Sequence, residues 1–153
     1  MRQPSLAYVA MLAALTACSG SGGGPERTTN QAQMTVGSLQ LTLAADQSTY
    51  RSGEPITLLL NLNNRSNLGT TVKFSSGQRY DFQIAGPSGA TAWTWSADKV
   101  FIQSLGSEDL APDGALEYRE QFTGQLAPGE YTVTGSITAM GSPLQVSTKV
   151  TVQ

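Results

Sequence analysis

Apolar and polar residues alternate one for one along much of the chain after residue 35. Leu39, Leu41 and Leu43 are separated by polar residues, and the same spacing recurs, with few exceptions, at 56–62, 72–74, 80–84, 116–122, 131–137 and 144–152. Successive side chains of a strand point to opposite faces, so this spacing places one face on a core and the other in water. Clusters of Gly, Pro, Asn and Ser separate the runs, as turns separate antiparallel strands. The pattern predicts an all-β fold, an antiparallel β-sandwich.

The first 17 residues have the features of an export signal rather than of a folded domain. Arg2 provides a positive start, and residues 6–15 form an apolar run. The run is too short for a membrane-spanning helix, which needs about 20 residues. It ends in Leu-Thr-Ala-Cys at 15–18, which resembles the bacterial lipobox, whose cysteine is lipidated and becomes the new N-terminus. We expect Cys18 to carry a lipid anchor, because the alternative, an ordinary secretory signal, leaves the position of the chain's single cysteine unexplained.

A Gly- and Ser-rich stretch follows Cys18 and continues as a polar segment to residue 33. This composition offers few apolar residues to bury, so residues 18–35 are predicted to form a flexible tether. The folded domain is then expected to span residues 36–153, after a signal peptide at 1–17. Ser19 occupies the position where an inner-membrane retention signal usually has Asp. Its resemblance to lipoprotein sorting signals implies the outer membrane or cell surface within the cell envelope.

Composition excludes several kinds of chemistry. The chain has no histidine and one cysteine, so it has no Ser-His-Asp or Cys-His arrangement and no intrachain disulfide. Its formal net charge of −2 gives no basic field for nucleic acid. Glu117 and Glu120 are candidates for a carboxylate pair, but Glu120 falls on the inward parity, where it needs a bulge or a partner such as Arg119. We expect a protein that is not an enzyme and needs no metal or cofactor.

The alternation lapses between residues 96 and 113. A loop of this length in a compact domain usually carries function or contains a short helix of its own. Ser96 is placed to cap one helical turn through residues 100–102. This loop and residues 75–79 are the candidate binding loops, although the Ser-Ser-Gly stretch at 75–77 also fits a tight turn.

Two motifs carry a family resemblance. Residues 74–82 read Phe-Ser-Ser-Gly-Gln-Arg-Tyr-Asp-Phe, and residues 93–96 read Trp-Thr-Trp-Ser. With the flanking segments at 50–56 and 126–133, they resemble the BsuPI-type intracellular proteinase inhibitor domain family over about residues 39–138. The resemblance implies an immunoglobulin-like β-sandwich, with about seven to eight strands expected. It also implies inhibition of serine proteases.

The chain departs from this family in one respect, because the namesake activity is cytosolic and this chain is predicted to be exported and tethered. A shared domain does not fix a shared target. The sequence therefore supports two functions: a non-enzymatic binding domain that inhibits an envelope protease, and an envelope interaction module without inhibitory activity. The expected partners are a protease or another envelope protein, together with the membrane that the lipid on Cys18 would enter.

The candidate partner-binding residues come from the two family motifs and the residues that follow them. Trp93 and Trp95 share a face of a predicted strand, where they either pack in the core or line a surface groove. Arg79 and Asp81 share an outer face, where they either join exposed ion pairs or face a partner. The candidate set is Ser75, Ser76, Gln78, Arg79, Trp93, Trp95, Asp98 and Lys99.

Overall fold

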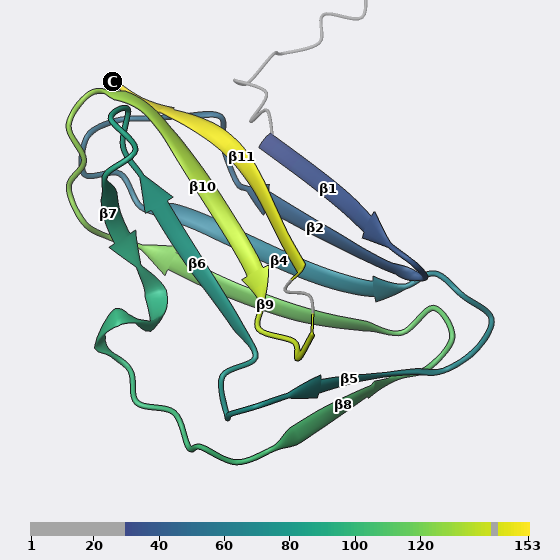
Figure 1. Ribbon diagram of the computed structural model, residues 1–153. Helices are drawn as coiled ribbons and strands as arrows, with labels where there is room; N and C mark the ends of the chain where they lie inside the picture. The colour runs from purple at the N-terminus through teal and green to yellow at the C-terminus, as the bar shows by residue number, and fades with distance from the viewer. Residues whose placement is uncertain (1–29, 142–143) are drawn as a thin grey trace, which may run out of the picture.

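Two β-sheets pack face to face, with a smaller third sheet at one end, in the computed structural model, which describes residues 30–141 and 144–153 (Figure 1). The first sheet, in spatial order, contains β1 (Asn30–Val36), β2 (Leu39–Ala45), β4 (Ile56–Asn64) and β9 (Ala115–Phe122). The second contains β3 (Thr49–Tyr50), β11 (Leu144–Val152), β10 (Gly129–Ile137), β6 (Tyr80–Ala85) and β7 (Thr91–Thr94). The third pairs β5 (Thr70–Phe74) with β8 (Gly106–Leu110).

This architecture confirms the predicted all-β sandwich. Every strand pair is antiparallel except β3 with β11. The described residues form 11 strands, more than the about seven to eight expected for an immunoglobulin-like sandwich. The extra elements are the polar β1, the two-residue β3 and the β5–β8 pair, whose pairings the apolar alternation does not reveal.

The inward-facing residues of the strands form one core, as the alternation predicts. In β4, Ile56, Leu58, Leu60 and Leu62 are at most 1% exposed, and the residues between them are half-buried. The same alternation in β2, β10 and β11 places their leucine, isoleucine and valine side chains in the same cluster. A fully buried large apolar side chain contributes about 1.5–3 kcal/mol, so this cluster is the main source of stability.

Gly135 in β10 determines how closely the two sheets approach. It lies between the buried residues Val133 and Ile137, on the inward parity, where an apolar side chain would be expected. A Cβ atom at Gly135 would lie 2.7 Å from Leu60 Cδ1 and 3.2 Å from Leu43 Cδ1. The leucines of the first sheet therefore occupy the space that a larger residue in β10 would need.

β1 corrects the predicted start of the folded domain. Residues 30–35, which the sequence assigns to the flexible tether, pair with β2 along the whole strand. Ala32 and Met34 are half-buried and pack against the core. The Asn30 side chain reaches β11, where its Oδ1 accepts a hydrogen bond from Thr148 Oγ1 at 2.9 Å. Backbone pairing and two inward side chains are sufficient for this strand, although its composition is polar.

The predicted signal peptide at 1–17, Cys18 and the first part of the predicted tether lie outside the described residues. Their roles therefore stay predictions from the sequence. In the part of the chain that the structure describes, no helix has the length and apolar content needed to cross a membrane.

The predicted long loop at 96–113 contains regular structure. A 3₁₀ helix, η1 (Trp95–Asp98), begins it, and β8 lies in its second half. The predicted cap is wrong, because Thr94 precedes the helix and makes no side-chain cap bond, while Ser96 lies inside it. Residues 100–102 follow the helix and are not helical.

Gly135→Ala is expected to lower the free energy of unfolding by about 1–3 kcal/mol, because the added methyl group overpacks the core against Leu60. Chemical denaturation followed by tryptophan fluorescence measures the change. Gly86→Ala is the matched control, since its Cβ would lie 3.7 Å from its nearest neighbours, an ordinary contact. Equal stability of the two variants would show that Gly135 does not set the sheet separation.

Candidate functional site

Residues 99–105, which connect η1 to β8, form an apolar segment on the surface. Val100 is fully exposed, Ile102 is 78% exposed and Leu105 is 77% exposed. The backbone enters the segment in an extended conformation at Lys99, with φ −112° and ψ 147°. Grouped apolar side chains in water mark interaction sites, because a protein that acts alone gains by burying them. The apolar segment is therefore the candidate site.

The start of the apolar segment is held against Trp95. The half-buried Phe101 ring lies 5.9 Å from the Trp95 ring, between centres. Lys99 Nζ lies 4.6 Å from the centre of the Trp95 ring and 3.3 Å from Asp98 Oδ1. Exposed contacts of these kinds contribute about 1 kcal/mol or less each. Their main effect is to orient the segment, and they direct the Lys99 side chain back onto the protein.

A bend at residues 75–77 supports the middle of the apolar segment. The Gly77 amide donates a hydrogen bond to the Ile102 carbonyl at 2.7 Å. A Cβ atom at Gly77 would lie 3.5 Å from the Ile102 backbone, so the two stretches of chain are in contact. The bend itself is shaped by Ser76 Oγ, which accepts a hydrogen bond from the Gln78 amide at 3.2 Å.

Arg79 connects this bend to β8. Its Nη1 donates to the Ser76 carbonyl at 2.7 Å, and its Nε donates to Glu108 Oε1 at 3.0 Å. The guanidinium carbon also lies 4.5 Å from the centre of the Phe74 ring. A Cβ atom at Gly106 would come within 2.6 Å of Arg79 Nη2, so the glycine at the start of β8 leaves the room that this side chain needs. Arg79 therefore joins an ion pair that is part of the support of the apolar segment.

Asp81 in β6 anchors η1. Its Oδ1 accepts a hydrogen bond from the Ser96 amide at 3.1 Å, and its Oδ2 accepts one from the Ser96 hydroxyl at 2.5 Å. Gln78 Nε2 donates to the same Oδ2 at 3.3 Å. Hydrogen bonds to a charged acceptor are stronger than neutral ones. Ser96 is thus engaged by Asp81, which is the physical reason that it does not cap a helix at 100–102.

An aromatic stack connects η1 to the core. Tyr80 stacks on Trp95 at 4.3 Å and on Tyr118 at 4.2 Å, between ring centres. Its hydroxyl donates to Glu120 Oε1 at 2.5 Å. Burial, and then the hydrogen bond to Glu120, raises the pKa of Tyr80 above its ordinary value, so the hydroxyl keeps its proton and remains a donor. Tyr80, rather than Arg119 or a bulge, is what allows Glu120 to face inward.

Most of the predicted partner-binding residues meet around the apolar segment, where they act as its supports. Trp93 lies apart from them and packs against Phe122, 5.4 Å away between ring centres. Ser75 is exposed at the bend. The supports among the predicted residues are Ser76, Gln78, Arg79, Trp95, Asp98 and Lys99.

The exposed apolar side chains of the segment itself are not among the predicted partner-binding residues. Val100, Ile102 and Leu105 are large and apolar, and in a sequence such residues indicate burial rather than exposure. The available signal is their position, because they lie where the alternation lapses at 96–113 and hence outside a pattern that would bury them.

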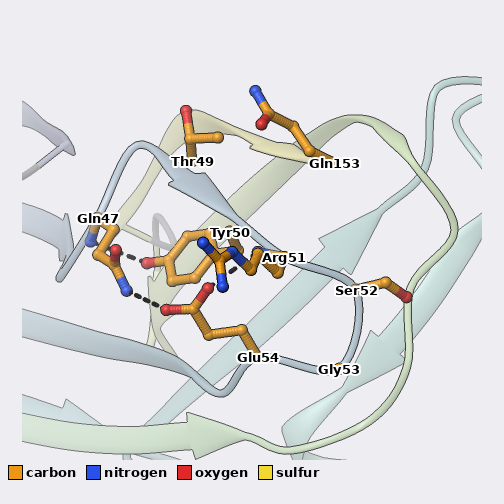
Figure 2. Close-up of a pocket in the computed structure, with 8 residues that line it drawn as sticks. All are labelled: Gln47, Thr49, Tyr50, Arg51, Ser52, Gly53, Glu54 and Gln153. Atoms are coloured by element: carbon orange, nitrogen blue, oxygen red, sulfur yellow. Dashed lines mark hydrogen bonds between the residues drawn. The ribbon is translucent and has the colours of Figure 1, made fainter.

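A concave region of about 570 Å³ lies beside the C-terminus, toward the other end of the sandwich from the apolar segment (Figures 1 and 2). It is lined by Gln47, Thr49, Tyr50, Arg51, Ser52, Gly53, Glu54 and Gln153. Gln47 Nε2 donates to Glu54 Oε1 at 2.7 Å, and the Arg51 amide donates to Glu54 Oε2 at 2.9 Å (Figure 2). These polar groups bond to one another within the turn after β3, so their role there is to hold the turn.

Solved structures of other proteins are similar to this one. The C-terminal domain of wzt aligns with a TM-score of 0.53 at 11% identity, covering 85% of this chain and 80% of that one. Spo0M, the sporulation control protein from Bacillus subtilis, gives 0.49 at 12% identity, covering 77% of this chain and 50% of that one. The Pseudomonas fluorescens alkylpurine DNA glycosylase AlkC gives 0.40 at 15% identity, covering 69% of this chain and only 27% of that one. No curated protein matches the sequence significantly.

At these identities the similarity to the wzt domain shows the fold alone. The fold and the site together define the class of protein: a β-sandwich domain that displays an apolar segment held in place by the rest of the domain. The sequence is more specific. The chain belongs to the BsuPI family, described as intracellular proteinase inhibitor, whose family model matches residues 43–142. The matched range contains the apolar segment and every support described above. The predicted family resemblance is confirmed.

Asp81→Ala is expected to loosen η1 and the apolar segment without unfolding the core. The substitution removes the acceptor of both Ser96 hydrogen bonds, and a hydrogen bond to a charged group contributes about 1.5–3 kcal/mol. Amide hydrogen exchange in residues 95–105 should therefore accelerate about ten-fold or more, while exchange in β4 and β10 stays close to that of the wild type. Gln83→Ala, at an exposed position of the same strand, should leave 95–105 unchanged. Slow exchange in Asp81→Ala would mean that another group anchors the helix.

Proposed function

We propose that this protein is a lipid-anchored, non-enzymatic inhibitor of a serine proteinase in the bacterial cell envelope. The observation that carries the proposal is membership of the BsuPI proteinase inhibitor family over residues 43–142. One fold hosts many functions, so the fold alone would not be sufficient. The apolar segment adds a surface by which such an inhibitor would bind its target.

A braced, protruding segment suits inhibition physically. A partner that must order a loose loop loses part of its binding free energy, and a loop that is ordered in advance avoids this loss. The contacts of Arg79, Asp81 and Trp95 order the apolar segment in the free protein. Burial of its side chains would slow dissociation, and affinity differences between related complexes lie mostly in the dissociation rate.

Anchoring at the envelope is supported by the Leu-Thr-Ala-Cys motif at 15–18. A fully extended chain from Cys18 to Asn30 spans at most about 40 Å, so a lipid on Cys18 would keep the domain near the bilayer. β1 begins beside the middle of β11, where Asn30 contacts Thr148, and the apolar segment lies away from this point (Figure 1). Because the family name refers to intracellular inhibitors, an exported member would act on a different proteinase.

The full chain, purified in a mild detergent from a bacterial host, is expected to inhibit at least one serine proteinase at about micromolar concentration or below. Residual hydrolysis of chromogenic peptides by a panel of such enzymes measures the inhibition. Circular dichroism rich in β-structure would confirm that the protein tested is folded. A folded protein that inhibits none of them would favour an interaction module without inhibitory activity and would end this proposal.

Cys18→Ser is expected to abolish lipidation, because a hydroxyl group does not replace the thiol that accepts the lipid. Metabolic labelling with a tagged fatty acid should mark the wild type, which should fractionate with membranes, and should leave the variant unlabelled. Ser19→Asp is the control that keeps the thiol, and its resemblance to the retention signal predicts a labelled protein in the inner membrane. Labelled Cys18→Ser protein would refute the lipobox assignment.

A further inference from the structure

We propose that the apolar segment enters the active-site cleft of the target proteinase, and that this proteinase accepts aliphatic rather than basic side chains. The inference rests on the proposed function. It adds to that function the part of the molecule that makes contact, the side chains that are recognised and the specificity class of the target.

The apolar segment has the form of a substrate strand. Its backbone is extended at Lys99, and its next side chains alternate, with Phe101 half-buried between the exposed Val100 and Ile102. Clefts that bind extended peptides bond to the main chain and take alternate side chains into pockets. Val100 and Ile102 are therefore placed to fill two pockets on one side of a cleft.

The side chains offered to the cleft determine the specificity class. Val100 and Ile102 are aliphatic and lie in water, so an apolar pocket would gain by burying them. The neighbouring cation is not offered, because Lys99 lies over the Trp95 ring at 4.6 Å and pairs with Asp98 at 3.3 Å. A cleft with an acidic pocket for lysine or arginine would therefore find no matching group without breaking these contacts.

The supports also explain how a substrate-like segment would inhibit rather than be consumed. A proteinase releases its products because the two halves of a cut chain diffuse apart. Here η1 is held by Asp81 on one side of Val100. On the other side, the Gly77 amide holds the Ile102 carbonyl at 2.7 Å, and Gly106 pairs with Phe74. Both halves would remain in place, so release would be slow.

Insertion into a lipid surface is the other use to which exposed apolar side chains are suited. One observation argues against it. The chain carries a net charge of −2, whereas surface-inserting segments usually rely on basic residues to attract anionic lipids.

Val100→Asp and Ile102→Asp test the inference in the full chain, in detergent, against an elastase-type, a subtilisin-type and a trypsin-type proteinase. The wild type is expected to inhibit at least one of the first two and not the third. Each variant should weaken that inhibition by about ten- to a hundred-fold, because a charge replaces an aliphatic side chain in a buried pocket. Leu68→Asp is the matched control, since Leu68 is 70% exposed but lies outside the segment, and it should inhibit like the wild type.

The outcomes separate this inference from the proposed function. If the wild type inhibits no proteinase, both fail. If it inhibits but Val100→Asp and Ile102→Asp inhibit equally well, with unfolding midpoints like the wild type, the function stands and the inference is overturned. Inhibition of the trypsin-type enzyme that Lys99→Ala abolishes would also overturn it.

Discussion

The close approach of the two sheets at Gly135 is the constraint on which the rest of the structure depends. Because β10 has no side chain at this point, Leu60 of the facing sheet fills the space. At this separation Tyr80 of the second sheet stacks on Tyr118 of the first, 4.2 Å apart between ring centres. The stack continues to Trp95, on which the apolar segment rests. Packing in the centre of the molecule thus determines where the segment lies on its surface.

Polar contacts then hold the apolar segment in this position. Asp81 holds η1 and Arg79 holds β8, so the apolar segment is supported at both ends. The exposed side chains of the segment add nothing to the stability of the domain. Burial of a large aliphatic side chain contributes about 1.5–3 kcal/mol, and Val100 and Ile102 remain in water. The segment therefore keeps its position through the contacts of its supports. Phe101, between Val100 and Ile102, packs inward and shows that the same stretch of chain has a place for an apolar group against the protein.

The sheets could be predicted from the sequence because a strand with one face on a core must alternate. β1 could not be predicted in this way, because it has few inward apolar residues. Its pairing with β2 relies on backbone hydrogen bonds, which the hydropathy of the sequence does not reveal. The family motifs located the supports near 75–79 and 93–99, but not their partners. Ser96 binds Asp81 instead of capping a helix, and Glu120 faces inward because Tyr80 reaches it. Such pairings depend on how separate strands are brought together, which local sequence does not determine.

The β5–β8 sheet joins stretches of chain that are distant in sequence, with Thr71 opposite Asp109 and Phe74 opposite Gly106. Pairings of this range form slowly, because the intervening chain must first be brought together. If the apolar segment enters the proteinase cleft as inferred above, a copy that has not closed this sheet presents residues 99–105 as an ordinary cleavable peptide. The target enzyme would therefore digest immature or damaged copies, in which the β5–β8 sheet is open, and leave intact the copies in which it is closed. In this way the proteinase would itself remove the misfolded copies of its inhibitor.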